Sequence, residues 1–85
     1  MPPPQLVRAM SLYHFDVRYD GRAWEDDDVG CECADCEEAR TQALGLAFSL
    51  AKEHPPASEI AIRVRDGEPE PILMVRVSTE IEHRG

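Results

Sequence analysis

The chain has 85 residues and a formal net charge of −8 at pH 7. A chain of this length forms one domain at most and buries a smaller share of its surface than a larger protein, so association with a partner would help to stabilise it. The acidic balance argues against nucleic acid as a partner, because phosphate binding needs a basic footprint. The sequence has no apolar run near the ~20 residues of a membrane span.

The two ends of the sequence differ in composition from its middle. Residues 1–10 contain three consecutive prolines, which favour an extended tail. We expect a single folded domain over residues 11–79 and a C-terminal tail over residues 80–85. The N-terminus lacks the charged-then-apolar pattern of a signal peptide, so we expect a cytoplasmic protein with reduced cysteines.

Alternation of apolar and polar side chains predicts a first strand over residues 12–19. Its apolar face holds Tyr13, Phe15, Val17 and Tyr19. Asp20-Gly21 is a turn signal, and a weaker strand is expected over residues 29–33. Between them lies much of an acidic block. Residues 20–38 hold nine acidic residues and one arginine, which equals the whole net charge, and we interpret this block as a solvated loop.

Residues 35–54 form the long helix of the prediction. Asp35 is a suitable N-cap and Glu38 follows three residues later, as in a capping box. Pro55 ends the helix. The apolar positions recur at helical spacing: Cys36, Ala39, Ala43, Ala47 and Leu50.

Two further strands are expected after the helix, over residues 59–65 and 72–77. The first alternates cleanly, with Ile60, Ile62 and Val64 on one face. Pro71, at the start of the second, favours an edge strand because proline cannot donate to a ladder.

The order of elements predicts an α+β fold. The pattern β-β-α-β-β suits a four-stranded antiparallel sheet in the order 2-1-3-4, with one helix packed on one face. The expected core combines the inner strand positions with the helix stripe: Tyr13, Phe15, Val17, Ala43, Ala47, Leu50, Ile60, Ile62, Val64 and Val75.

The sequence also resembles a known family. The runs at residues 13–18, 30–40 and 61–67 are similar to those of a bacterial family of small domains of unknown function, the 6894 family. The resemblance extends from about Leu12 to about Val77. It implies the fold above and no activity or catalytic residues. Cys33 and Cys36 stand where relatives more often place larger apolar residues.

Three cysteines form a C-x-C-x2-C cluster at Cys31, Cys33 and Cys36. Zinc usually takes four ligands, and the fourth would be His14 or His54. The simpler interpretation is that Cys33 and Cys36 are small apolar residues in the core. We therefore expect no metal and no cofactor, with a metal- or redox-responsive protein as the alternative.

Two acidic arrangements are candidates for chemistry. His14 and Asp16 share one strand face and resemble half of an acid–base site, but no nucleophile accompanies them, so we interpret them as a surface contact. Asp26, Asp27 and Asp28 lack the ligand spacing of a calcium-binding loop, so we interpret them as solvated. We therefore expect no enzymatic activity.

A binding surface is expected on the outer sheet face. It consists of four arginines and two aliphatic residues: Arg18, Arg63, Arg65, Arg76, Ile72 and Met74. Leu44 and Phe48 on one helix flank offer a second contact. The sequence thus predicts a non-enzymatic interaction or regulatory module whose partner is another protein or a second copy, and neither nucleic acid nor a membrane.

Overall fold

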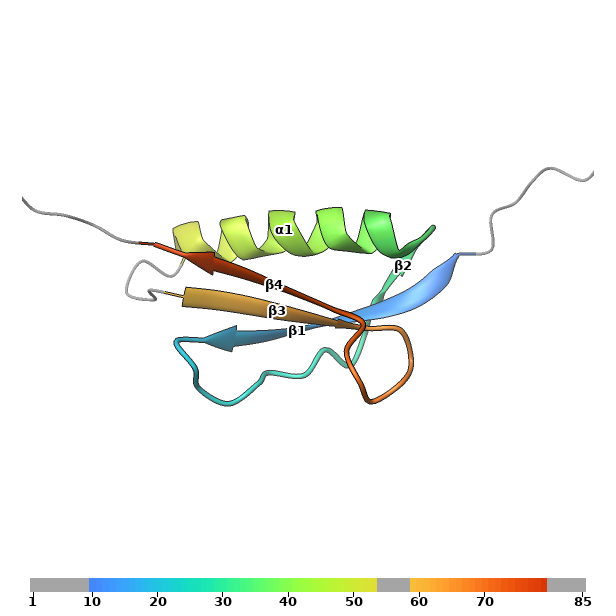
Figure 1. Ribbon diagram of the computed structural model, residues 1–85, viewed down its shortest axis with the longest axis horizontal. Coiled ribbons are helices and arrows are strands. Elements are labelled where there is room, and N and C mark those ends of the chain that lie inside the picture. Colours follow the sequence, from blue (N-terminus) through green and yellow to red (C-terminus); the bar gives the residue numbers. More distant parts are fainter. Residues whose placement is uncertain (1–9, 54–58, 80–85) are drawn as a thin grey trace, which may run out of the picture.

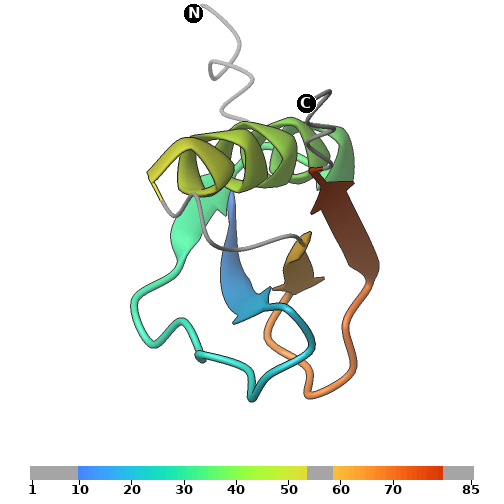
Figure 2. The ribbon, with the colours of Figure 1, turned by 90° about the vertical axis from the view of Figure 1, so that its left-hand side faces the viewer.

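Four strands and one helix make up the computed structural model, which describes residues 10–53 and 59–79 (Figure 1). In chain order the elements are β1 (Ser11–Tyr19), β2 (Cys31–Cys33), α1 (Cys36–Glu53), β3 (Glu59–Arg65) and β4 (Leu73–Ser78). The strands form one antiparallel sheet in the order β2-β1-β3-β4, and α1 covers one face of it (Figure 2). The predicted α+β fold and strand order are confirmed.

Helix α1 begins with the predicted cap. The Asp35 carboxylate accepts a hydrogen bond of 2.9 Å from the N–H of Glu38, which satisfies one of the unpaired donors of the first turn. The sheet-facing residues of α1 are the fully buried Ala39, Ala43 and Ala47, whose short side chains let the helix lie close to the sheet. Among the described residues no helix has the length and apolar character that a membrane crossing requires.

The core lies between α1 and the inner face of the sheet. The strand residues buried there are Tyr13, Phe15, Ile60, Ile62, Val64 and Val75. Val17 and Leu50, also expected in the core, lie half-buried at its border. Ala61 points to the outer face as expected but is completely buried, because it lies between the long side chains of Arg18 and Arg76 on the neighbouring strands.

The limits of three predicted strands are wrong, and the first strand begins one residue early, at Ser11. The second strand begins at Cys31, and Val29 lies in the preceding loop with 83% of its surface exposed. Gly30 explains the late start: its φ of +81° belongs to a turn and not to a strand. The last strand runs from Leu73 to Ser78, one residue later at each end than predicted.

The Asp20-Gly21 turn signal is correct, and its geometry directs the acidic loop. The N–H of Arg22 donates to the C=O of Tyr19 over 3.0 Å, and both central residues have positive φ, 50° and 72°. This is the type I′ geometry of a tight hairpin. The chain therefore returns alongside β1.

Three predictions concern residues that lie outside the described part of the chain. Both predicted tails lie outside it except for Met10, which is exposed, and His54 lies outside it as well.

Candidate functional site

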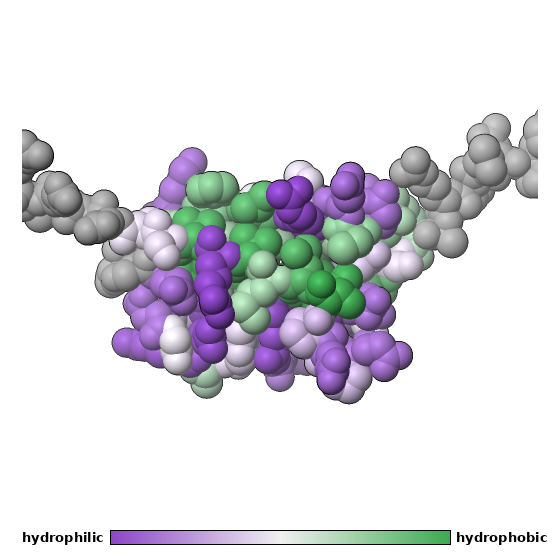
Figure 3. Space-filling view, viewed as in Figure 1, coloured by the Kyte–Doolittle hydropathy of each residue, from purple (hydrophilic) through white to green (hydrophobic). Residues whose placement is uncertain are grey.

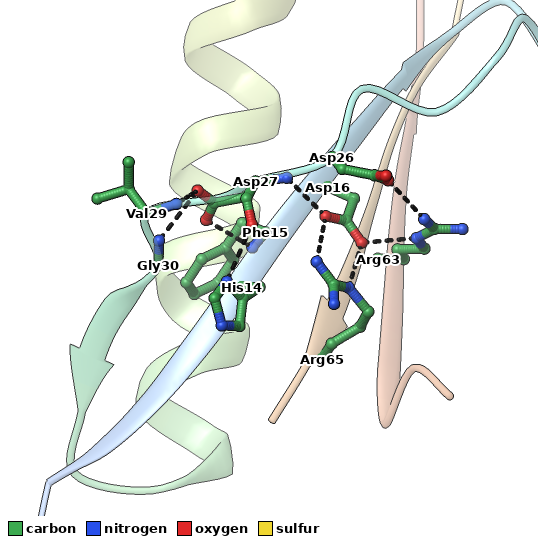
Figure 4. A network of polar contacts seen from close by, with 9 residues as sticks. All are labelled: His14, Phe15, Asp16, Asp26, Asp27, Val29, Gly30, Arg63 and Arg65. Carbon is green, nitrogen blue, oxygen red and sulfur yellow. Dashed lines mark hydrogen bonds and ion pairs between the residues drawn. The ribbon is translucent and has the colours of Figure 1, made fainter. Parts of the chain in front are cut away.

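Asp16 is the centre of the polar network on the outer sheet face, and its side chain is completely buried. Arg63 lies opposite it on β3, and its Nε donates to Oδ2 over 2.6 Å. Arg65 donates from Nε to Oδ2 over 2.6 Å and from Nη2 to Oδ1 over 2.9 Å (Figure 4). The N–H of Asp27 adds a fourth hydrogen bond, of 2.8 Å. One carboxylate therefore orients two of the four predicted arginines.

This network keeps Asp16 ionised. Burial alone would raise the pKa of a carboxyl group, but the hydrogen bonds from Arg65 and Arg63 outweigh burial and hold the pKa of Asp16 well below its usual range. The same contact raises the pKa of Arg65. The interpretation of Asp16 as part of a solvated surface contact is therefore wrong, because its arginine partners exclude water from it.

Asp27 joins the acidic loop to β1. Its Oδ2 accepts the N–H of Phe15 over 3.0 Å, and its Oδ1 accepts the N–H groups of Val29 and Gly30, each over 3.0 Å (Figure 4). Its carbonyl oxygen accepts from Nδ1 of His14 over 2.9 Å. Burial acts to raise the pKa of Asp27, and the three backbone N–H groups act in the opposite direction and lower it overall.

The loop that follows the β1 turn is therefore ordered along the edge of β1. Glu25 and Val17 exchange backbone hydrogen bonds of 3.0 and 2.7 Å, and Asp26 accepts from Nη2 of Arg63 over 2.9 Å. The prediction of a solvated loop is wrong for Asp27, which is half-buried, and holds for the exposed Asp28. This part of the acidic block completes the sheet.

Trp24 completes the outer face. Its ring contacts two guanidinium groups, with Cζ of Arg18 4.5 Å and Cζ of Arg63 4.6 Å from the ring centroid. Such distances allow cation–π attraction. Arg18, Arg63 and Arg65 are all half-buried, so three of the four arginines expected to form an open cationic surface are held by neighbours within the chain.

The other three predicted binding residues lie on β4 or just before it, on the same outer face, with Met74 opposite Arg63 and Arg76 opposite Ala61 on β3. Arg76 and Met74 are exposed on β4, and Ile72 is exposed just before it. Figure 3 shows hydrophobic surface over the junction between β4 and α1, bordered by hydrophilic residues. The structure thus keeps the predicted site on one face, but only its β4 part is exposed.

One flank of α1 faces the β4 side. Figures 1 and 2 show α1 above the sheet with β4 on the near side, and α1 runs from right to left in Figure 1. A right-handed helix in this direction turns the positions after Ala43 and Ala47 towards the near side. These positions are Leu44 and Phe48, one turn apart, and Phe48 is 55% exposed.

The three cysteines occupy different environments. Cys33 is fully buried, whereas Cys31 and Cys36 are exposed, and all three are free thiols. Burial raises the pKa of Cys33 to about 11, so it stays a neutral thiol. The interpretation of both residues as core residues is therefore correct for Cys33, which is buried just before α1. It is wrong for Cys36, which is exposed at the first position of α1. Within the described part of the chain, no three His, Cys, Asp or Glu residues are grouped as a metal site would require.

The roles of two residues of this network were not predicted from the sequence. Trp24 lies outside any alternating segment, although a single tryptophan among acids was a signal that it packs somewhere. Asp27 is flanked by Asp26 and Asp28, and nothing in the sequence separates the three. The Gly30 three residues later was the available clue, since aspartate side chains often accept N–H groups in such turns.

The fold and network define a small α+β domain in which one helix covers a four-stranded sheet and an acidic loop closes one sheet edge. The chain matches the model of the domain of unknown function DUF6894 over residues 12–78 and belongs to that family. No curated protein and no solved structure matches it.

Proposed function

We propose that this protein is a non-enzymatic protein-interaction module whose contact surface combines strand β4 with the adjacent flank of α1. The observation that carries the proposal is the position of the exposed apolar side chains. Phe48, Ile72 and Met74 are 55%, 43% and 41% exposed, and they lie on these neighbouring elements. Apolar surface with a polar border is typical of protein contact sites, and Arg76 supplies charge at this border.

The polar groups of the opposite edge support binding over catalysis. His14 and Asp16 each hold a structural partner, Asp27 for the first and the arginine pair for the second. Cys33 is buried as a neutral thiol. These groups stabilise the fold, so the proposed contact depends on the exposed apolar side chains of β4 and α1.

Site-specific photocross-linking in the host cell tests this proposal. A photoreactive amino acid replaces Met74 or Phe48, and a matched control replaces Glu32, which is exposed on β2 at the other edge. Discrete cross-linked products from positions 74 and 48, and none from position 32, support the proposed surface. Equal products from all three positions, or products from position 32 alone, contradict it.

A further inference from the structure

Apart from the exposed Arg76, strand β4 lacks the protection that edge strands usually carry. Prolines, inward-pointing charges and bulges normally keep such edges from pairing with other chains. The six residues of β4 include no proline, and those facing α1 are Leu73, Val75 and Val77. Among the described residues no strand pairs with its outer side. Alternate backbone N–H and C=O groups of β4 are therefore available to a further strand.

We infer that a second copy of this chain covers this edge. The two β4 strands pair antiparallel about a two-fold axis at Val75 and join two four-stranded sheets into one of eight strands. The inference rests on the proposed function and names its partner. An interface of this kind uses the same surface on both copies, so the surface has to be complementary to itself.

Strand β4 meets this requirement at one register. With the axis at Val75, Leu73 lies opposite the partner's Val77 on the inner face. On the outer face Met74 lies opposite the partner's Arg76. A shift by one residue would place inner-face residues against outer-face ones. An axis at Arg76 would set two like charges against each other, and an axis at Met74 would pair a shorter stretch of β4.

The helices favour the same arrangement. A two-fold axis perpendicular to the sheet keeps both helices on one side of it. Helix α1 packs chiefly over β3 and β4, and neighbouring strands lie about 4.8 Å apart, so the two helix axes would lie roughly 10 Å apart, a normal packing distance. The flanks with Leu44 and Phe48 then face each other. This contact buries Phe48, the most exposed large apolar side chain of α1.

Charge distinguishes between the two sheet edges as sites for a second copy. The acidic loop between β1 and β2 lies beside β1, on the side of the sheet away from β4. Pairing through β2 would bring two acidic loops together, whereas pairing through β4 places them at opposite ends of the eight-stranded sheet. The β4 contact is mainly apolar, so raising the salt concentration should leave it in place.

Sedimentation equilibrium of the full chain over a range of concentrations tests the inference. We expect a dimer. Met74→Arg sets an arginine against the partner's Arg76 twice in each dimer and should raise the dimer Kd about fivefold or more. Phe48→Glu should raise it further. Glu32→Arg, an exposed change at the other edge, is the matched control and should leave Kd unchanged.

A second substitution tests the register. Adding Arg76→Glu to Met74→Arg places opposite charges across the axis and should return Kd to within about twofold of the original value. Circular dichroism of each variant shows whether the fold is kept. A dimer weakened by Met74→Arg and not restored by the second change contradicts the axis at Val75.

The remaining outcomes separate this inference from the proposed function. A chain that is monomeric at every concentration overturns the second copy as the occupant. If cross-links from Met74 to a different protein are then found, the proposed surface stands, and if none are found both proposals fail. A dimer that is indifferent to Met74→Arg and Phe48→Glu, or that dissociates at 1 M salt, also overturns the inference.

Discussion

The two edges of this sheet are completed in different ways. On one side β2 has three residues, and the returning loop supplies hydrogen-bond partners to the rest of β1 through Glu25 and Asp27. On the other side β4 has six residues, and among the described residues nothing pairs with its outer groups. The first edge is closed along β1 by groups within the chain, with Leu12 and Val29 exposed beside it, and the second is open along β4.

This difference shows what the acidic residues near β1 do. Asp16, Asp26 and Asp27 accept hydrogen bonds from backbone N–H groups and arginines of the same chain. Their charge therefore stabilises the closed edge, and the buried Asp16 is unavailable to a partner. The open edge has exposed apolar groups and the exposed Arg76 instead, which suits contact with another protein. Substitutions at the closed edge should change stability, and those at the open edge should change association.

The largest expected effect comes from Asp16→Ala. The substitution leaves Arg63 and Arg65 without their buried partner and removes the acceptor of the Asp27 N–H group. Breaking one partner from a buried ion pair costs about 3–5 kcal/mol. The two arginine side chains keep 25% and 21% exposure, so we expect about 3 kcal/mol in urea denaturation, a large share of the stability of a small domain.

The control for Asp16→Ala is Asp28→Ala, which removes an exposed carboxylate from the same loop and should change the free energy of unfolding by less than about 0.5 kcal/mol. Equal denaturation midpoints for the two variants would contradict the assignment of Asp16 as the buried centre of the closed edge.

The second-largest effect should come from acid, which lowers the free energy of unfolding by weakening the closed edge. The pKa values of Asp16 and Asp27 are lowered in the folded chain, so both groups bind protons more readily when unfolded. Their stabilisation is complete above the unfolded value of about 3.9 and is lost as the pH falls through the folded values. The free energy of unfolding should therefore be nearly constant from pH 7 to about pH 5 and decline below about pH 4.

Urea denaturation at a series of pH values measures this decline. Asp16→Asn removes one of the two titrating groups and should make the decline below about pH 4 shallower, by up to about 1.4 kcal/mol per pH unit. An equal slope in the variant would show that other groups cause the acid sensitivity.

Gly30→Ala should have a smaller effect at the point where the closing loop enters β2. A Cβ at residue 30 would lie 2.9 Å from Cδ1 of Leu12 and 3.1 Å from the carbonyl oxygen of Tyr13, at a φ of +81°. We expect a loss of about 1–3 kcal/mol. Gly45→Ala is the matched control: its Cβ meets nothing within 4 Å in the helix, and it should gain up to about 1 kcal/mol. Similar changes in thermal midpoint for both would contradict this.

The sequence predicted the fold because its elements are encoded locally. Alternation in β1 and β3, the Asp35 cap and the alanine stripe of α1 each specify one element, and burial of their apolar faces leaves few arrangements. The strand order 2-1-3-4 followed because it makes every neighbouring pair antiparallel.

The candidate site was less predictable because it depends on pairings between distant residues. Arg63 and Arg65 looked free until the register placed them beside Asp16, 47 and 49 residues earlier in the chain. Likewise, alternation put Asp16 on an outward face, and outward positions are normally solvated. Only the loop and the arginines over that position make it buried.

Substitutions of Trp24 should have the smallest effect on the stability of the closed edge, and two of them can be compared. Its ring faces Arg18 and Arg63 at 4.5 and 4.6 Å, and each such contact contributes about 0.5–1 kcal/mol at a partly exposed site. Trp24→Leu keeps an apolar side chain but removes both contacts, so it should cost about 1 kcal/mol in urea denaturation. Trp24→Phe retains an aromatic face and should cost less. If leucine and phenylalanine cost the same, the indole contributes apolar contact alone and Arg63 is held by Asp16 and Asp26 without it. If leucine costs more, the ring is part of what closes this edge, and neither variant should alter association at β4.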